Sequence, residues 1–545
     1  MTVTTNYLGT GNGITGSTAN VVASLVSGAV IPSGDITGVS DVTAIQAAID
    51  AAEAAGFGTV TLVPGQTYYL FASRRISGDS AWLALQGKSN VTLNLNGAEL
   101  RLVGSTCISG ANNYGGHVIY CRSVSNFTVE NGTINGNRAN FTQVPFAGGV
   151  TVDGLTILDG EVGCGVRARL SCTNITIRNC TLKNNIYHGA LGVEGSVGFV
   201  VTGNRITGNG YRAFHYNTES LTAVASCNFS GNYVEGNGAS ADNSLNSGVF
   251  IALGAVANIA CNDNIIKGEK FDAISVSGGA LATKASRVVI ANNLIEGSSA
   301  GVTLAVGAAN LSFIGNVMKG NGGTTSNIGV RVSNCQGVLV QGNTIERYGR
   351  GVSLDTAGTK DVFIHGNNIT DCDVAGIYAG PAAMSGISIQ GNGIRDCGLT
   401  AASVNSQAIY LEGTMNGCNI QGNTISRNKG NAVLLSDFRK GSVSGNTFHD
   451  NFDGGGGGRG RAIFLRATSD NVRVSNNFIM NQNVTNNVTQ VDIEATCTNI
   501  GVTENYAQGT AANLFVAATG ATGRAYGNTG TASWPVGFTT GSAAL

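Results

Sequence analysis

Gly366-Asn367-Asn368-Ile369 is one copy of a phrase, Gly-Asn-x-Ile, that recurs through most of the chain. Further copies, some with a changed residue, have their asparagines at Asn204, Asn232, Asn264, Asn293, Asn316, Asn343, Asn392, Asn423, Asn446, Asn477, Asn505 and Asn528. Successive asparagines lie roughly 23 to 32 residues apart, and a period of about 20 to 50 residues is typical of solenoids, propellers and arrays. The phrase predicts a bend in each coil, where the asparagine side chain can bond to the same asparagine one coil away.

Short runs with period-two alternation precede each copy of the phrase. Gly329-Val330-Arg331-Val332-Ser333 and Gly337-Val338-Leu339-Val340-Gln341 are examples, with Val at the alternate positions. Such alternation predicts strands with one buried face. We therefore expect an all-β chain in which residues 83–530 form about fifteen stacked coils, because a solenoid grows by adding coils rather than cores.

The composition fits this expectation and excludes several functional classes. Of 545 residues, 80 are Gly and only 5 are Pro, and Pro would remove hydrogen-bond donors from a ladder of strands. Charged residues make up 12% of the chain and the formal net charge is -1, so nothing points to nucleic acid or to a membrane surface. No apolar run reaches the length of about 18 residues that a membrane span requires.

The 12 cysteines suggest thiols rather than a disulfide framework. Several of them recur where other coils carry Asn, Ser or small apolar residues: Cys164, Cys172, Cys180, Cys227 and Cys261. A buried reduced cysteine packs as a small hydrophobe, so we predict mostly free thiols and folding in a reducing compartment. No His/Cys group has zinc-ligand spacing, and no metal site is predicted.

The N-terminal part predicts a cap for the solenoid. Residues 1–38 read as a leader or adaptor without a basic region followed by an apolar stretch, so we predict no signal peptide. Residues 40–52 have an apolar i, i+4 face that predicts a helix, with Ser40 or Asp41 as its cap. Residues 39–82 would hold this helix and the first strand, and residues 531–545 would be a C-terminal tail. A terminal coil needs a cover because it exposes both its core and its ladder edge.

The segment from Thr43 to Pro64, which ends in Thr59-Val60-Thr61-Leu62-Val63-Pro64, resembles the phage tailspike branch of the pectate-lyase superfamily. The repeat over residues 40–530 resembles the single-stranded right-handed parallel β-helix of that superfamily. The resemblance implies a polysaccharide depolymerase that binds and cuts bacterial surface polysaccharides as a homotrimer. It implies no catalytic residue, and it admits Ca²⁺ as a cofactor. The absence of a substantial anchoring domain before residue 40, and of a separate trimerisation domain after residue 530, leaves a bacterial enzyme or an epimerase open.

Outward side chains of the strand that begins each coil are expected to form columns, because coils stack about 4.8 Å apart. Residues 162–273 place on or beside this face Arg167, Arg169, His188, Glu194, Tyr211, Arg212, His215, Glu219, Lys270 and Asp272. A polysaccharide lyase needs a cation for the uronate carboxylate and a base for the C5 proton. Arg169 and Arg212 fit the first role, and His188, Tyr211 or His215 the second. The remaining residues of this set would bind substrate, and the alternative reading is a solvated patch of ordinary turn residues.

A second set consists of Asp355, Tyr378, Tyr410 and Glu412. Asp355 and Glu412 are predicted to lie two coils apart in one column, about 10 Å between backbones. Tilted side chains could bring the carboxyl groups into the range of roughly 6.5 to 9.5 Å found in inverting glycosidases. Tyr378 and Tyr410 could stack on sugar rings. The alternative is a pair of solvated carboxylates beside edge-packed tyrosines.

The sequence therefore predicts an enzyme that cleaves an extracellular, acidic bacterial polysaccharide by β-elimination. The alternatives are an inverting glycoside hydrolase that uses Asp355 and Glu412, a C5-epimerase that acts on an intact chain, and a non-catalytic glycan-binding fibre protein. The expected place of action is extracellular or on a virion tail, after folding in the cytoplasm. A homotrimer is expected from the resemblance alone.

Overall fold

The computed structural model describes a large part of the chain: residues 29–70, 74–76, 79–103, 114–137, 150–152, 155–157, 163–185, 187–193, 195–217, 225–238, 248–252, 256–269, 272–277, 286–298, 300–305, 308–323, 326–398, 407–451, 460–480, 490–508, 514–530, 532–533 and 538–540. These residues belong to two compact units, divided between Val288 and Val289. Each unit is a stack of coils in which the chain passes in turn through three parallel sheets, here called sheet 1, sheet 2 and sheet 3.

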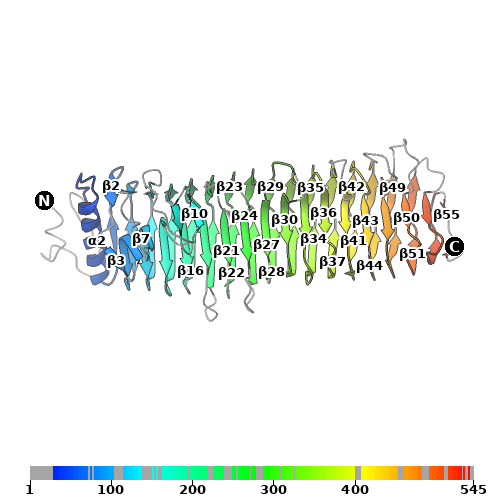
Figure 1. The fold of residues 1–545 in the computed structure, drawn as a ribbon, viewed down its shortest axis with the longest axis horizontal. Helices are drawn as coiled ribbons and strands as arrows, with labels where there is room; N and C mark the ends of the chain where they lie inside the picture. Colours follow the sequence, from blue (N-terminus) through cyan, green and yellow to red (C-terminus); the bar gives the residue numbers. More distant parts are fainter. Residues whose placement is uncertain are drawn as a thin grey trace. The chain divides into compact units, whose positions relative to one another are not determined.

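One coil of the first unit shows the winding (Figure 1). The chain runs through β12 (Val166–Arg169) in sheet 1, β13 (Thr173–Arg178) in sheet 2 and β14 (Thr181–Lys183) in sheet 3. The next coil repeats the path, and its strands pair parallel and in register with these three. The fold is the single-stranded right-handed parallel β-helix that the sequence predicted, and its winding places each period of the repeat beside the next.

The other strands of the first unit follow the same order, except that the short strand β3 pairs antiparallel with β4 within sheet 1. Sheet 1 contains β3 (Arg74–Ile76), β4 (Asp79–Gln86), β7 (Tyr114–Arg122), β15 (Ala190–Val193), β18 (Phe214–Asn217), β21 (Val249–Ala252) and β24 (Asp272–Ser277). Sheet 2 contains β1 (Gly58–Thr61), β5 (Val91–Asn94), β8 (Ser125–Glu130), β16 (Val197–Thr202), β19 (Ala225–Ser230) and β22 (Val256–Asn262). Sheet 3 contains β2 (Thr67–Leu70), β6 (Glu99–Leu102), β9 (Thr133–Asn135), β17 (Arg205–Thr207), β20 (Tyr233–Glu235) and β23 (Ile265–Lys267). A separate antiparallel pair joins β10 (Val150–Val152) and β11 (Leu155–Ile157).

The second unit repeats the three sheets. Sheet 1 contains β27 (Ala300–Ala305), β30 (Ile328–Val332), β33 (Arg350–Leu354), β36 (Ala375–Ala379), β39 (Gln407–Leu411), β43 (Val433–Ser436), β47 (Ile463–Arg466), β50 (Val491–Ile493), β53 (Phe515–Ala517) and β55 (Ala532–Ser533). Sheet 2 contains β28 (Ala309–Ile314), β31 (Gln336–Gln341), β34 (Lys360–His365), β37 (Met384–Gln390), β40 (Met415–Asn416), β41 (Asn419–Gln421), β44 (Phe438–Arg439), β45 (Ser442–Ser444), β48 (Arg473–Ser475), β51 (Ile500–Thr503), β54 (Gly523–Tyr526) and β56 (Phe538–Thr540). Sheet 3 contains β26 (Leu294–Glu296), β29 (Val317–Lys319), β32 (Thr344–Glu346), β35 (Asn368–Thr370), β38 (Gly393–Arg395), β42 (Thr424–Ser426), β46 (Thr447–His449), β49 (Phe478–Met480) and β52 (Tyr506–Gln508).

Helix α2 (Val39–Ala54) covers the N-terminal end of the first unit, where it packs against β1, β2, β4 and β5 (Figure 1). Its start differs from the expected cap, because Gly38 is the N-cap and makes no side-chain cap bond. Asp41 is instead buried and accepts hydrogen bonds from Ser33 and from the Tyr69 backbone N–H, so it ties the helix to β2. Among the described residues, no helix is long and apolar enough to cross a membrane.

The repeated phrase lies at the bend between sheet 2 and sheet 3, as the sequence predicted. In the second unit, the Asn343 side-chain amide donates to Asn367 Oδ1, and the Asn367 amide donates to Asn392 Oδ1, at 2.9 and 3.0 Å. The backbone N–H of each asparagine donates to the same oxygen. Gly366 precedes Asn367 with φ of 62°, a backbone region that glycine adopts without strain. The stacked asparagines therefore satisfy one another's polar groups inside each bend.

Asn367→Ala is expected to lower the free energy of unfolding by about 3 kcal/mol, because it leaves several buried donors and acceptors without partners. The affected groups belong to Asn343, Asn392 and the Val340 carbonyl, to which Asn367 Nδ2 also donates. Denaturant unfolding of the full chain measures the change. Asn368→Ala is the matched control, since Asn368 is the next residue and its side chain is exposed. Equal effects of the two substitutions would contradict a stabilising asparagine ladder.

A second ladder follows sheet 3 in the first unit. Asn185, Asn209 and Asn237 stack in the same way, and the next coil carries Glu269 at this position. Glu269 Oε1 accepts from the Asn237 backbone N–H and Nδ2 at 3.4 and 3.2 Å. A Cβ on Gly248 would lie 2.8 Å from Glu269 Cγ, so glycine there leaves room for the carboxyl side chain. The ladder thus ends on a buried carboxyl group.

The cysteines of the described residues are free and buried, which confirms the prediction for these positions. Cys107 lies outside the described residues. Burial raises the pKa of Cys180 and of Cys261 to about 12, so both thiols are protonated and inert at neutral pH. These residues act as small core side chains.

Candidate functional site

The first candidate set lies on the outer face of sheet 1 in the first unit. Arg167 on β12, Leu191 on β15 and His215 on β18 are register partners, as the predicted column requires. The turns that lead into these strands also stack, because Gly165 N–H donates to His188 O and Gly189 N–H donates to Arg212 O, both at 3.0 Å. Stacking of strands and turns brings together the group called cluster 1 below: His117, Arg167, His188, Tyr211, Arg212 and His215.

Hydrogen bonds link the members of cluster 1. Arg212 Nη1 lies 3.2 Å from His215 Nδ1, and that nitrogen lies 3.2 Å from His188 Nε2. Arg212 Nη2 donates to the Tyr211 hydroxyl at 3.1 Å, and its guanidinium carbon lies 4.5 Å from the centre of the Tyr211 ring. Arg167 Nη1 lies 2.9 Å from His117 Nε2. The distances place two guanidinium groups in direct contact with imidazole rings.

Aromatic rings hold His188 in place. The Tyr187 and Tyr211 rings are stacked with centroids 4.6 Å apart, and His188 contacts both, with centroid distances of 4.0 and 5.3 Å. The two tyrosines occupy equivalent positions in successive turns, since Tyr211 N–H donates to Tyr187 O at 2.8 Å. His188 is therefore fixed between a tyrosine pair and His215, whose ring centroid is 4.9 Å away.

Burial makes the histidines of cluster 1 neutral. Desolvation, aided by Arg167 and Arg169, holds the pKa of His117 well below its usual value. Desolvation does the same for His215 with help from Arg212, and for His188 with help from His215, Arg212, Arg167 and His117. Burial also lowers the pKa of Arg212, although nearby Tyr211, Tyr187 and Asp272 oppose this effect. The cluster consequently holds buried imidazole bases beside buried guanidinium cations.

Other residues of the first predicted set lie at the edge of cluster 1 or outside the described chain. Arg169 ends β12 and acts electrostatically on His117, and Asp272 begins β24 and acts on Arg212. Glu194, Glu219 and Lys270 lie outside the described residues. The predicted roles of all five remain predictions.

The second predicted set lies on sheet 1 of the second unit, in the predicted column. Ser353, Tyr378 and Tyr410 are register partners. Backbone bonds continue this ladder, since Gly380 N–H donates to Leu354 O at 2.9 Å and Glu412 N–H donates to Ala379 O at 3.0 Å. Asp355 and Glu412 therefore lie two coils apart, and the coil between them carries Gly380 at this position.

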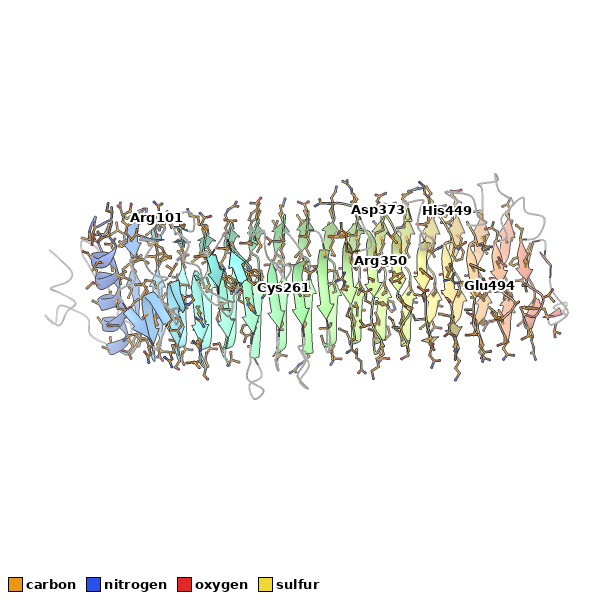
Figure 2. All side chains as sticks on the ribbon, in the orientation of Figure 1. Arg101, Cys261, Arg350, Asp373, His449 and Glu494 are labelled. Atoms are coloured by element: carbon orange, nitrogen blue, oxygen red, sulfur yellow. The ribbon has the colours of Figure 1, made fainter. Side chains whose placement is uncertain are left out.

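Arginines surround the second set, and the group called cluster 2 below comprises Arg331, Arg350, Asp355, Tyr378, Tyr410, Glu412 and Arg466. Figure 2 shows Arg350 on the same face as Glu494, away from Asp373 and His449. Asp355 Oδ2 lies 3.2 Å from Arg331 Nε, and Glu412 Oε1 lies 3.9 Å from Arg466 Nη2. The two carboxylates are ion-paired and partly exposed.

The tyrosine rings of cluster 2 have little free surface. Tyr378 is 7% exposed and Tyr410 is 1% exposed. The Arg350 guanidinium lies 3.6 Å from the centre of the Tyr378 ring, and Arg466 Nη2 donates to the Tyr410 hydroxyl at 2.8 Å. Tyr378 and Tyr410 pack edge to face against each other, within an apolar group that includes Leu434. Stacking of a sugar on these rings therefore requires the arginines to move.

Neither cluster resembles a metal centre. In the described parts of the chain, no group of three or more His, Cys, Asp or Glu side chains is arranged to hold a metal ion. Ca²⁺ binding remains a prediction from the resemblance.

The first predicted set does not contain His117 and Tyr187, which the structure places in or beside cluster 1. His117 lies 50 positions before Arg167, too far along the chain for a local pattern to pair the two residues. The parallel of Tyr187-His188-Gly189-Ala190 with Tyr211-Arg212-Ala213-Phe214, one period later, was a usable signal. Arg350 in cluster 2 begins its strand, where alternation gives little indication of direction.

Comparisons with known proteins agree with the fold. A family model described as a right-handed β-helix region matches residues 71–237 and 328–507. The family model of the periplasmic copper-binding protein NosD matches residues 242–394. A comparison with curated proteins finds no match.

Several solved structures are similar to this chain at low identity. The mannuronan C-5 epimerase AlgE6 A-module of Azotobacter vinelandii is 18% identical, with 93% of this chain and 97% of that chain covered and a TM-score of 0.34. A tailspike protein of the E. coli bacteriophage HK620, in complex with a hexasaccharide, is 15% identical, with 83% and 79% covered and a TM-score of 0.44. PfbA, a surface adhesin of Streptococcus pneumoniae, is 14% identical, with 80% and 91% covered and a TM-score of 0.42.

Proposed function

Because the chain belongs to the right-handed β-helix family, we propose that it degrades an acidic bacterial polysaccharide by β-elimination at cluster 1. The observation that carries the proposal is the contact between guanidinium cations and neutral histidines on the outer face of sheet 1. This pairing of a cation with a base is what removal of a proton next to a carboxylate requires.

The arginines supply the electrostatic part of the reaction. A uronate carboxylate bound by Arg167 and Arg212 would be neutralised, and the C5–H beside it would become more acidic. Arginine suits this role because its planar fork matches a carboxylate and it stays charged. Arg169 at the end of β12 extends the same positive region.

The histidines supply the base. Arg212 and Arg167 contribute to the low pKa of His188, so a carboxylate bound between them would raise the pKa of this imidazole. His188 would then become a stronger base only when an acidic sugar is bound. The proton leaves C5, its electron pair forms the C4–C5 double bond, and the C4–O bond breaks with its electrons on the leaving oxygen. The Tyr211 hydroxyl, which accepts from Arg212, keeps its own hydrogen to give to that oxygen.

A panel of purified capsular polysaccharides and exopolysaccharides tests the proposal. β-Elimination gives oligosaccharides with a conjugated double bond, seen by ultraviolet absorbance and by mass spectrometry. Reducing ends without a double bond would indicate hydrolysis, and altered sugar composition without chain cleavage would indicate an epimerase. Binding without any fall in polymer viscosity would indicate a glycan-binding fibre protein.

Arg212→Ala is expected to lower kcat/KM by about 10²- to 10³-fold on the polysaccharide that the wild-type chain cleaves, which is the effect of removing one preorganised donor from a reacting oxyanion. Initial rates of double-bond formation measure the change. Arg205→Ala is the matched control, because the Arg205 side chain lies on sheet 3 of the same unit and is 54% exposed. Unchanged activity of Arg212→Ala would contradict the assignment of cluster 1.

Hydrolysis at cluster 2 is the second candidate function. The observation that favours it is the column Asp355, Gly380, Glu412, in which the middle residue has no side chain. Two partly exposed carboxylates about 10 Å apart at the backbone would leave space for a sugar and a water between them. In this case Arg350 and Arg466 would move aside, and Tyr378 and Tyr410 beneath them would form the floor of the site.

The remaining expectations accompany this function as proposals. The chain would act outside the cell or on a virion tail, and it would assemble as a homotrimer. The domain boundaries proposed from the sequence stay at residues 38, 82 and 530. Strands β1 and β2, which come before the proposed boundary at residue 82, pair in parallel with β5 and β6 of the next coil.

A further inference from the structure

Arg212, His215 and His188 form a chain of polar contacts whose proton positions can be deduced. Arg212 Nη1 and His188 Nε2 both lie 3.2 Å from the same atom, His215 Nδ1. Each of these side chains is fixed by a further contact: Arg212 by the Tyr211 hydroxyl and ring, and His188 by the Tyr187 ring.

A guanidinium group has donors and no acceptor, so Arg212 can only donate to His215 Nδ1. His215 Nδ1 is therefore the acceptor nitrogen of a neutral imidazole, and the hydrogen of His215 is on Nε2. An acceptor nitrogen cannot donate to His188, so the hydrogen in the second contact belongs to His188 Nε2. His188 Nδ1 is then the nitrogen that carries a lone pair.

His188 Nδ1 is buried and has no hydrogen-bond partner among the described residues. Leaving a buried acceptor without a partner costs about 1 to 3 kcal/mol. A buried polar atom of this kind requires an explanation, and a functional role in accepting a proton is one. The ring cannot turn to relieve it, because Tyr187, Tyr211 and His215 contact three sides of the imidazole.

We infer that Arg212, in addition to the carboxylate contact proposed above, sets the tautomers of His215 and His188 and so positions the base, and that His188 Nδ1 is the atom that accepts the proton. The inference rests on the proposed function and specifies its base. The proton passes from C5 of the acidic sugar to His188 Nδ1, the C4–C5 double bond forms, and the leaving oxygen takes a proton from Tyr211. Transfer of the proton from His188 to the Tyr211 oxygen restores both residues.

Nitrogen NMR of the full chain with ¹⁵N-labelled histidine tests the inference without any substrate. The chain has only 5 histidines, and His188→Gln and His215→Gln identify the two resonances of interest. We expect both rings to be neutral Nε2–H tautomers at pH 7.5. A wild-type spectrum with the hydrogen on His188 Nδ1, or with a charged His188, would overturn the inference.

Arg212 is tested by two substitutions of similar length. In Arg212→Met the donor is lost, and His215 is expected to populate both tautomers, with a matching change at His188. In Arg212→Lys a donor returns, and the wild-type tautomers are expected to return with it. Identical spectra for the wild type and Arg212→Met would overturn the positioning role. If Arg212→Met does not fold, the wild-type spectrum still decides the tautomers and Arg212→Lys still tests the donor.

The outcomes separate this inference from the proposed function. Expected tautomers in a chain that cleaves no polysaccharide would support the proton arrangement and contradict the lyase. Double-bond formation in a chain with the opposite His188 tautomer would support the lyase and contradict His188 Nδ1 as the base.

Discussion

Glu269→Gln is expected to change the free energy of unfolding in a pH-dependent way. The change should be about 5 kcal/mol more favourable at alkaline pH than at pH 4.5. Glu269 is 2% exposed, and burial raises its pKa from 4.5 to about 8. A folded-state pKa above the unfolded value means that the native state holds a proton that the unfolded state has released. The stability this provides is complete below pH 4.5 and is lost as the pH rises towards 8.

Glutamine at position 269 keeps the hydrogen bonds from Asn237 and has no carboxyl group that titrates. Its Oε1 can accept from Asn237 as Glu269 Oε1 does, and its amide carries no charge at any pH. Denaturant unfolding at pH 4.5, 6.5 and 8.5 measures the difference between variant and wild type. Glu504→Gln is the control, because the Glu504 side chain is exposed and surface carboxylates contribute little. A pH-independent difference between Glu269→Gln and the wild type would show that Glu269 is ionised in the folded chain.

Acid is expected to destabilise the protein steeply below pH 6.5. The pKa values of His117, His188 and His215 are all lowered, chiefly by burial. A depressed folded-state pKa provides stability that is present above the unfolded value and lost as the pH falls. Unfolding would take up as many as three protons, so the free energy of unfolding should fall by about 4 kcal/mol per pH unit once the unfolded histidines are charged.

Single histidine substitutions measure how much each histidine contributes to the slope of the free energy of unfolding against pH. His188→Gln is expected to reduce the slope by about 1.4 kcal/mol per pH unit, which is the contribution of one proton. His449→Gln is the control, because the His449 side chain is 32% exposed. Unfolding curves between pH 7.5 and 5.0 provide the measurement, and a wild-type slope near zero would mean that cluster 1 takes up protons while folded. If His188→Gln is too unstable, His117→Gln tests the same slope.

The regular part of the fold followed from the sequence because two short-range signals determine it. Alternation of apolar residues fixed which side chains of each strand point outward, and the column Ser353, Tyr378, Tyr410 is therefore correct. The Gly-Asn phrase fixed the register, because Asn343 and Asn367 must meet one coil apart. Both signals repeat in every coil, so the register predicted for one coil must agree with the register predicted for the next coil.

The contacts of the site were harder to predict because they join turns whose lengths vary. His117 meets Arg167 across a separation of 50 positions, and no local pattern pairs a histidine with a residue that far away. Glu269 stands where the preceding coils carry an asparagine in the second ladder, and the sequence assigned it no role. Burial of Tyr378 and Tyr410 depends on the side chains of Arg350 and Arg466, which curve back over the rings.

The asparagine stack has a direction, since the side-chain amides of Asn343, Asn367, Asn392 and Asn423 each donate to Oδ1 of the next asparagine towards the C-terminus. Aligned amide dipoles polarise one another, so each added member strengthens those before it. A segment running from one ladder asparagine to the residue before the next is thus an interchangeable module, whatever its loop length. Joining Gly342 to Asn367 would excise one such module and leave Asn316 facing an identical partner. Gene duplication and deletion can lengthen or shorten such a protein without redesigning its interior.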